Sequence, residues 1–164
     1  MNNQLPKDWK WVKIEDGANA YGGYAFKSQE FKNNGKYQVL RMGNVRPGIL
    51  RYEESPVYLD NVEESTLSRA LLKPDDVIIT QTGTRKKRDY GFTAIIPKKN
   101  LLLNQRITAV RFSGNYLPKF FLYYSWTNSF KDQFFAKETG KVGQGNVGMK
   151  SITETFIPYC SIEA

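Results

Sequence analysis

The stretch VIITQTGTRKKRDYGFTAII, residues 77–96, predicts a β-hairpin with a long basic tip. Its two ends, Val77–Thr80 and Gly91–Ile96, are rich in β-branched and aromatic residues, which favour strands. The segment between them, Gln81–Tyr90, contains four consecutive basic residues and one glycine. Pro74–Asp76 is a typical turn sequence directly before the first strand. We therefore expect an antiparallel pair of strands that carries basic side chains at its connection.

Outside this hairpin, short apolar or alternating runs predict further strands. These runs are Trp9–Ile14, Lys36–Met42, Leu101–Leu103, Ile107–Phe112 and Thr155–Ile157, the last of which ends at Pro158. The glycine-rich segments Gly17–Gly23 and Gly140–Gly148 are predicted to be loops. Strands outnumber helices and the two are mixed along the chain, so we expect an α+β fold with a mainly antiparallel sheet.

Helical spacing is found in three places. Asn61 and Glu64 have the spacing of a capping box, and a helical pattern follows over residues 62–72. The longest helix is predicted at about residues 118–138, with a proline in its first turn, and a short turn or helix is predicted at Met149–Thr153. Aromatic residues in the long helix predict a buried face rather than a base-stacking surface. They are Phe120, Phe121, Tyr123, Tyr124 and Trp126.

Length and composition restrict the classes of protein that remain. The 164 residues contain no repeat or linker-like segment, so we expect one domain over residues 1–164. With no histidine and a single cysteine, the chain cannot hold a Ser-His-Asp site, a Cys/His zinc finger or an internal disulfide. It has no Walker or dinucleotide-binding motif either, so we expect no cofactor and no metal. No apolar stretch is long enough for a signal peptide or a membrane span, and we therefore expect a cytoplasmic protein with no membrane partner.

The charge of the chain favours a polyanionic partner. Its formal net charge is +8, and two segments concentrate the bases: residues 27–51 and residues 77–100 each carry six bases and one acid. Residues 52–76 between them carry seven acids and two bases. We therefore expect one basic face and one acidic face, with the basic face attracting phosphates.

The basic tip is the strongest candidate for chemistry. Arg85 and Arg88 have the side chain that can pair with guanine O6 and N7, whereas Lys86 and Lys87 act as point charges on phosphates. We expect at least one of the two arginines to read a base. The alternative is a solvated loop whose charges only keep the protein in solution.

A second candidate is GKVGQGNVG, residues 140–148. Its backbone N–H groups could hold a phosphate, and Gln144 or Asn146 could pair with adenine N6 and N7. The alternative is an ordinary connection between a helix and a strand. Tyr24 precedes Lys27 near another glycine-rich segment, where an exposed and a packed position both remain open.

Five segments together resemble a known family. They read LPKDWKWVKIEDGA, FKSQEFKNNGKYQVLRMGNVRPG, LLKPDDVIITQTGTRKK, LLLNQRITAVRF and GKVGQGNVGMKSITETFIPYC, in this order, over about residues 5–160. Their order and spacing resemble a target recognition domain of the DNA specificity subunit of type I restriction-modification systems. The resemblance implies an α+β domain with a twisted antiparallel sheet, which binds duplex DNA and reads one half of a split target.

The resemblance also implies partners. The chain itself would be non-catalytic, and a separate methylation subunit and a restriction subunit of the same system would act on the DNA. In that family an Ile-Pro motif, here Ile157-Pro158, leads into a long spacer helix that joins a second recognition half. The sequence stops at Ala164, so we expect one recognition half without its spacer.

Carried onto this chain, the resemblance places three loops against DNA, namely Gly22–Ser28, Gln81–Tyr90 and Gly140–Gly148. The predicted DNA-contacting residues are Tyr24, Lys27, Ser28, Gln81, Thr82, Thr84, Arg85, Lys86, Lys87, Arg88, Tyr90, Lys141, Gln144 and Asn146. Two other classes stay open. A single-strand or RNA-binding module would stack bases on exposed aromatic rings, and a compact nuclease would need convergent carboxylates and a divalent metal.

Overall fold

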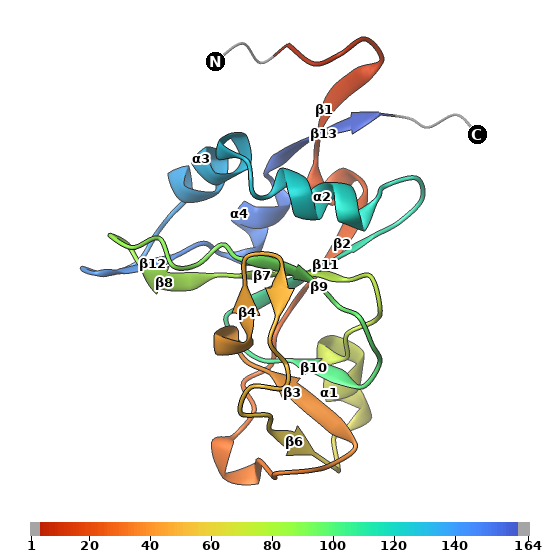
Figure 1. Ribbon diagram of the computed structural model, residues 1–164, viewed down its shortest axis with the longest axis vertical. Coiled ribbons are helices and arrows are strands. Elements are labelled where there is room, and N and C mark those ends of the chain that lie inside the picture. The colour runs from red at the N-terminus through yellow and green to blue at the C-terminus, as the bar shows by residue number, and fades with distance from the viewer. Residues whose placement is uncertain (1–3, 161–164) are drawn as a thin grey trace.

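A four-stranded antiparallel sheet lies at the centre of the computed structural model, which describes residues 4–160 (Figure 1). Its strands follow the order β2 (Ala18–Gly22), β11 (Ile107–Phe112), β7 (Val77–Thr80) and β9 (Thr93–Ile95). The antiparallel pairing of β7 with β9 confirms the predicted hairpin. β11 lies between β7 and β2 and so joins this hairpin to the N-terminal part of the chain.

Both faces of this sheet are covered, which explains the unbroken apolar run in β7. Val77 and Ile79 belong to one cluster of buried side chains, and Ile78 belongs to a second cluster on the other face. All three are fully buried. Because successive residues of a strand point to opposite faces, a strand without polar alternation fits a sheet that is buried on both sides.

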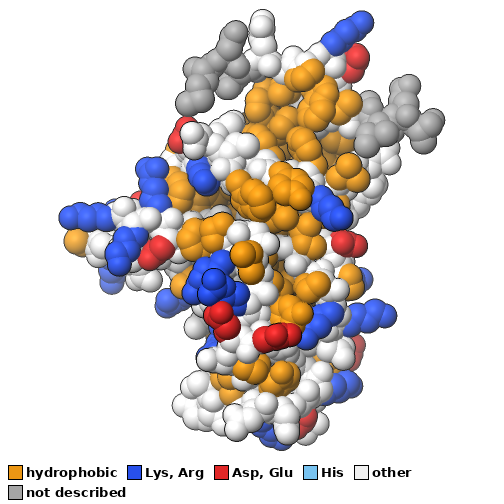
Figure 2. All heavy atoms as spheres, in the orientation of Figure 1, with side chains coloured by type: hydrophobic (Ala, Val, Ile, Leu, Met, Phe, Trp, Pro, Cys, Tyr) orange, Lys and Arg blue, Asp and Glu red, His pale blue; other side chains and the backbone are white. Residues whose placement is uncertain are grey.

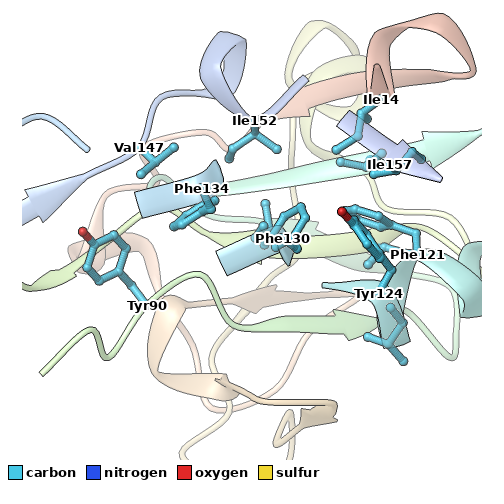
Figure 3. Close-up of a cluster of buried hydrophobic side chains, with 13 residues drawn as sticks. Ile14, Tyr90, Phe121, Tyr124, Phe130, Phe134, Val147, Ile152 and Ile157 are labelled. Atoms are coloured by element: carbon cyan, nitrogen blue, oxygen red, sulfur yellow. The ribbon is translucent and has the colours of Figure 1, made fainter. Parts of the chain in front are cut away.

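Three helices cover the upper face in Figure 1: α2 (Pro118–Tyr124), α3 (Asn128–Ala136) and α4 (Met149–Thr153). They supply much of the first cluster, in which the rings of Phe121, Phe130 and Phe134 lie close to one another (Figure 3). Phe121 meets Phe130 edge to face, with ring centroids 5.7 Å apart. Aromatic burial on this scale dominates the energy of a small core.

A second layer lies below the central sheet. It contains a sheet of order β10 (Leu101–Leu103), β3 (Tyr37–Leu40) and β6 (Tyr58–Leu59), together with the helix α1 (Glu64–Ala70). β10 runs parallel to β3, unlike the other paired strands of residues 4–160. Its residues again point both ways, since Leu101 and Leu103 join the second cluster and Leu102 joins a third that includes side chains of α1.

Three further strand pairs lie around these layers. They are β1 (Trp9–Lys13) with β13 (Phe156–Cys160), β4 (Val45–Arg46) with β5 (Ile49–Leu50), and β8 (Thr82–Thr84) with β12 (Gln144–Asn146). Short 3-10 turns occur at Ile14–Asp16, Ser28–Glu30 and Met42–Asn44. Within residues 4–160 the mostly antiparallel strands and four α-helices confirm the predicted α+β class. No helix in this range is long and apolar enough to cross a membrane.

A buried ion pair links β11 to the turn before β7. Arg111 donates through Nε and Nη2 to the two carboxylate oxygens of Asp76, each at 2.7 Å. Asp76 is 1% exposed and also accepts from the backbone N–H of Lys73 at 2.8 Å. The hydrogen bonds from Arg111 to this carboxylate raise the pKa of the guanidinium above its ordinary value. The guanidinium lies over the ring of Tyr21, so the pair also contacts β2.

Two loop and helix predictions are wrong. The segment Gly17–Gly23 contains the strand β2, because its backbone pairs with β11, which lies far away in the sequence. The long helix at 118–138 is two helices. Ser125 donates to the carbonyl of Leu122 at 2.6 Å, and Thr127 caps α3 by accepting from the N–H of Phe130 at 3.3 Å. These hydroxyl groups compete for backbone partners and end one helix before the next begins.

Three smaller predictions also need correction. The helix after Asn61 begins only after Glu63, and no side chain caps it, so the capping box is not formed. The last strand continues through Pro158, which faces Trp11 in the register of β1 and β13. A proline is tolerated there because β13 pairs with one strand only among the described residues. Of the aromatic residues expected to be buried, Tyr123 is 59% exposed and Trp126 is 40% exposed.

The ion pair of Asp76 generates a stability prediction. Asp76→Ala leaves the partly buried guanidinium of Arg111 without its carboxylate, and we expect the free energy of unfolding to fall by about 3 kcal/mol. Urea denaturation measures this loss. The control is Glu54→Ala, which breaks the exposed pair of Arg51 and Glu54 and should cost less than about 1 kcal/mol. Equal losses of unfolding free energy for the two variants would show that the pair of Arg111 and Asp76 stabilises the fold no more than an exposed pair does.

Candidate nucleic-acid interface

Two of the three predicted DNA-contacting segments form one structure. β8, from the basic connection after β7, pairs antiparallel with β12, from the glycine-rich segment after α3. The register is Thr82 with Asn146, Gly83 with Gly145, and Thr84 with Gln144. This two-stranded ribbon projects from one side of the molecule (Figure 1). The prediction of a loop over Gly140–Gly148 is therefore wrong at β12. The pairing was not predicted, because the two segments are separated by β9, β10, β11 and two helices.

The two glycines at the centre of the ribbon allow it to lie directly on the body of the protein. A Cβ atom at Gly83 would come within 2.6 Å of Asp89 Oδ1 and 2.7 Å of a ring carbon of Tyr90. At Gly145 a Cβ atom would overlap the hydroxyl of Tyr90 and the carboxylate of Glu138. Because these glycines face each other in the register, one whole face of the ribbon has no side chains at its centre.

Tyr90 fills the space below this glycine face. It is 2% exposed, and its ring meets Phe135 edge to face at 5.2 Å and lies 6.0 Å from Phe134 (Figure 3). Thr82 is also buried, with its hydroxyl 3.3 Å from the sulfur of Met42. Both residues were predicted to contact DNA. Because both residues are buried, DNA cannot reach them, and the prediction is wrong for both. Tyr90 supports the ribbon from below, and Thr82 lies at its inner end.

The opposite face of the ribbon is polar. Alternation along each strand places Thr82, Thr84, Gln144 and Asn146 on the face that the glycines do not use. Thr84 and Gln144 are exposed, and Asn146 is half-buried. The accessible part of this face, which we call the polar face, therefore consists of Thr84, Gln144 and Asn146. It offers hydroxyl and amide groups that can both donate and accept hydrogen bonds.

Both arginines of the tip are held by α3 or the residues just after it. Arg85 Nε lies 2.8 Å from Glu138 Oε2, and the Arg85 backbone N–H donates to the carbonyl of Gly143 at 3.2 Å. The guanidinium of Arg88 lies over the ring of Phe135, 4.7 Å from its centroid. These contacts were not foreseen, because neither Glu138 nor Phe135 stands out in its local sequence.

The lysines of the two segments are placed differently. Lys86, Lys87 and Lys141 are all exposed. The turn that carries the first two is fixed at its base, where the N–H of Thr84 donates to Asp89 Oδ1 at 2.6 Å. Figure 2 shows Lys and Arg side chains gathered over this projection of the molecule. The ribbon therefore combines an uncharged polar face with a cationic end.

A short turn at residues 105–106 lies between the base of the ribbon and the third predicted segment. Gln81 donates its backbone N–H to the carbonyl of Arg106 and accepts from the N–H of Val147, both at 2.9 Å. Gly23 donates to the carbonyl of Ile107, the first residue of β11, at 3.1 Å. Gln81 is half-buried at this junction, so it lies at the base of the ribbon and not on its open face.

The side chains of the third segment lie beyond this turn, in the lower layer. The ring of Tyr24 packs against Phe26, with centroids 5.0 Å apart, and remains 37% exposed. Lys27 and Ser28 are exposed, and Lys27 lies 3.7 Å from Glu30. Tyr24 is thus both packed and partly exposed. The structure brings two predicted segments together and leaves the side chains of the third apart from them.

The expected separation of basic and acidic faces is wrong for the first basic segment. Lys32 pairs with Asp60 at 2.8 Å, and Arg51 pairs with Glu54 at 3.2 Å. Basic side chains of residues 27–51 therefore lie next to acidic side chains of residues 52–76, and the two segments do not form separate faces. The ribbon is the place where several exposed lysines from two separate segments gather.

Residues 4–160 contain no candidate metal site. Within residues 4–160, no three side chains of Asp, Glu, Cys or His gather in a way that could hold a metal ion. The nuclease alternative was based on convergent carboxylates, and it has no supporting observation in this part of the chain.

Comparison with known proteins supports the fold and gives a family. The family model described as Type I restriction modification DNA specificity domain matches residues 6–164. A curated relative, the Type I restriction enzyme EcoAI specificity subunit of Escherichia coli, is 29% identical over 121 residues, which are 73% of this chain and 20% of that protein.

Two solved structures share the fold. The HsdS subunit from Thermoanaerobacter tengcongensis has a TM-score of 0.68 at 15% identity, over 99% of this chain and 36% of that chain. The S subunit of a type I restriction-modification system from M. genitalium has a TM-score of 0.59 at 14% identity, over 99% of this chain and 37% of that chain. This chain therefore spans well under half the length of each of these three proteins.

The glycine face generates a prediction about the ribbon. Gly145→Ala places a methyl group against Tyr90 and Glu138, and we expect it to lift β12 from the body and to expose the amides of β8 and β12 to hydrogen exchange. The matched control is Gly148→Ala, where a Cβ atom meets nothing within 4 Å and φ is −70°. Unchanged exchange in the Gly145 variant would show that the close approach is not required.

Proposed function

Because the chain belongs to the type I restriction modification DNA specificity domain family, we propose that it binds duplex DNA in a sequence-specific manner through the β8–β12 ribbon. In this proposal the domain reads one half of a two-part target. A separate methylation subunit and a restriction subunit of the same system then act on the DNA, so the chain contributes recognition and no chemistry.

The observation that carries the proposal is the two-sided construction of the ribbon. The major groove of B-DNA admits a two-stranded β-ribbon, and base edges there are read by side chains that donate and accept hydrogen bonds. One face of the ribbon is packed through Gly83 and Gly145, and the polar face of Thr84, Gln144 and Asn146 points the other way. Gln and Asn are the side chains that pair with adenine N6 and N7.

The cationic end suits the backbone of the same DNA. Lys86, Lys87 and Lys141 are exposed next to the polar face, where each can reach a phosphate as a flexible point charge. Phosphate contacts fix the position of a protein on the duplex, and base contacts supply the specificity. We do not include Tyr24, Lys27 and Ser28 among the residues that read bases, because their side chains lie in the lower layer, apart from the polar face.

Binding assays test this function directly. In fluorescence anisotropy, we expect the chain to prefer duplex to single-stranded DNA and RNA, with an affinity that falls steeply as salt increases. Selection from a random duplex library should then yield a short common sequence. Preference for single strands would instead favour stacking on exposed rings such as Tyr123 and Trp126, and would overturn the proposal.

The two kinds of contact should respond differently to substitution. Gln144→Ala should cost about 1–3 kcal/mol on the selected duplex and little on a scrambled one. Lys86→Ala should weaken both duplexes alike and reduce the salt slope by about 0.9. Lys119→Ala on α2 removes the same charge away from the ribbon and serves as the control. Equal losses on both duplexes for the Gln144 variant would remove this side chain from base reading.

A further inference from the structure

The arginines of the tip lie on the packed side of the ribbon. Arg85 directly follows Thr84, and its backbone is still bonded across the ribbon to Gly143. Alternation therefore turns its side chain away from the polar face. Its partner Glu138 also lies on that side, because it is one of the groups that a Cβ atom at Gly145 would overlap. Arg85 thus points away from the polar face and toward α3.

The last turn of α3 and the residues after it hold the ribbon at three points. Arg85 pairs with Glu138, Arg88 lies on the ring of Phe135, and Tyr90 meets the same ring edge to face. The side chain of Glu138 is only 18% exposed, and that of Arg85 is 39% exposed. Glu138 is therefore the more deeply placed partner, and without it the buried Nε of Arg85 has no neighbouring carboxylate.

We propose that Glu138 is a positioning residue that controls the selectivity of the DNA-binding domain. The carboxylate keeps Arg85 on the packed side of the ribbon, where its charge is neutralised and cannot add an unspecific phosphate contact. The same pair holds the tip so that Thr84 and Gln144 keep their orientation. This inference rests on the proposed function and assigns a role to a residue outside the three predicted loops.

The test compares Glu138→Ala with the unchanged chain on two duplexes, one selected from the random library and one scrambled. Releasing Arg85 should strengthen binding to the scrambled duplex and steepen its salt slope by about 0.9, because one more cation reaches a phosphate. Binding to the selected duplex should weaken, so that the ratio of the two affinities falls by about tenfold. The affinity should therefore rise for the scrambled duplex and fall for the selected one. A general loss of folded protein would lower both affinities, so the two explanations can be distinguished.

Three further variants complete the experiment. In Glu138→Ala combined with Arg85→Ala, the gain on the scrambled duplex should disappear. Glu138→Gln removes the charge but keeps the size of the side chain, and it should also steepen the salt slope. It replaces the alanine variant if that variant does not fold. Glu54→Ala removes the same charge and releases Arg51 instead, and it should leave the ratio of affinities unchanged.

Two outcomes overturn the inference. The first is an unchanged affinity and salt slope on the scrambled duplex for both Glu138 variants, which would mean that Arg85 is not withheld from phosphates. The second is an equal loss on both duplexes, which would make Glu138 merely structural. Failure of the proposed function is separate, because it would already be seen as an absence of duplex selectivity in the unchanged chain.

Discussion

The close approach of Gly83 and Gly145 to Tyr90 is the constraint on which the candidate interface depends. Any side chain at either position would separate the ribbon from the body, because the ring and hydroxyl of Tyr90 already occupy the space. Since strands alternate, removing side chains from one face leaves the functional groups of β8 and β12 on the other. The packing of the ribbon and the polar character of its open face therefore have the same cause.

The hairpin of β7 and β9 was predictable because its signal is local. Val77–Thr80 is a run of β-branched residues that follows a turn sequence, and its partner lies within the same stretch of sequence. The ribbon was not predictable in this way, since the partner of β8 is β12, which follows α3 much later in the sequence. A signal was nevertheless present: Thr82-Gly83-Thr84 and Gln144-Gly145-Asn146 each place a glycine between two polar residues.

Two local patterns in the sequence did not predict the structure correctly. Asn61 had the spacing of a helix cap, yet the helix begins later, after Glu63, without any side-chain cap. The formal charge likewise described the bases but not their partners. Arg85 belongs to the most basic run of the chain, and its guanidinium is nevertheless held by Glu138, which follows α3. Charge patterns in a sequence therefore indicate the class of ligand better than they indicate the contacting residues.

Site-specific photo-crosslinking of the 164-residue chain to a duplex selected by it tests whether the polar face meets DNA bases. A photoreactive amino acid is placed at Gln144 on the polar face or, in a separate variant, at Tyr123, which is also exposed and lies on α2. We expect crosslinks to bases from position 144 and none from position 123. Crosslinks from position 123 without any from position 144 would place the DNA on another surface and contradict this expectation.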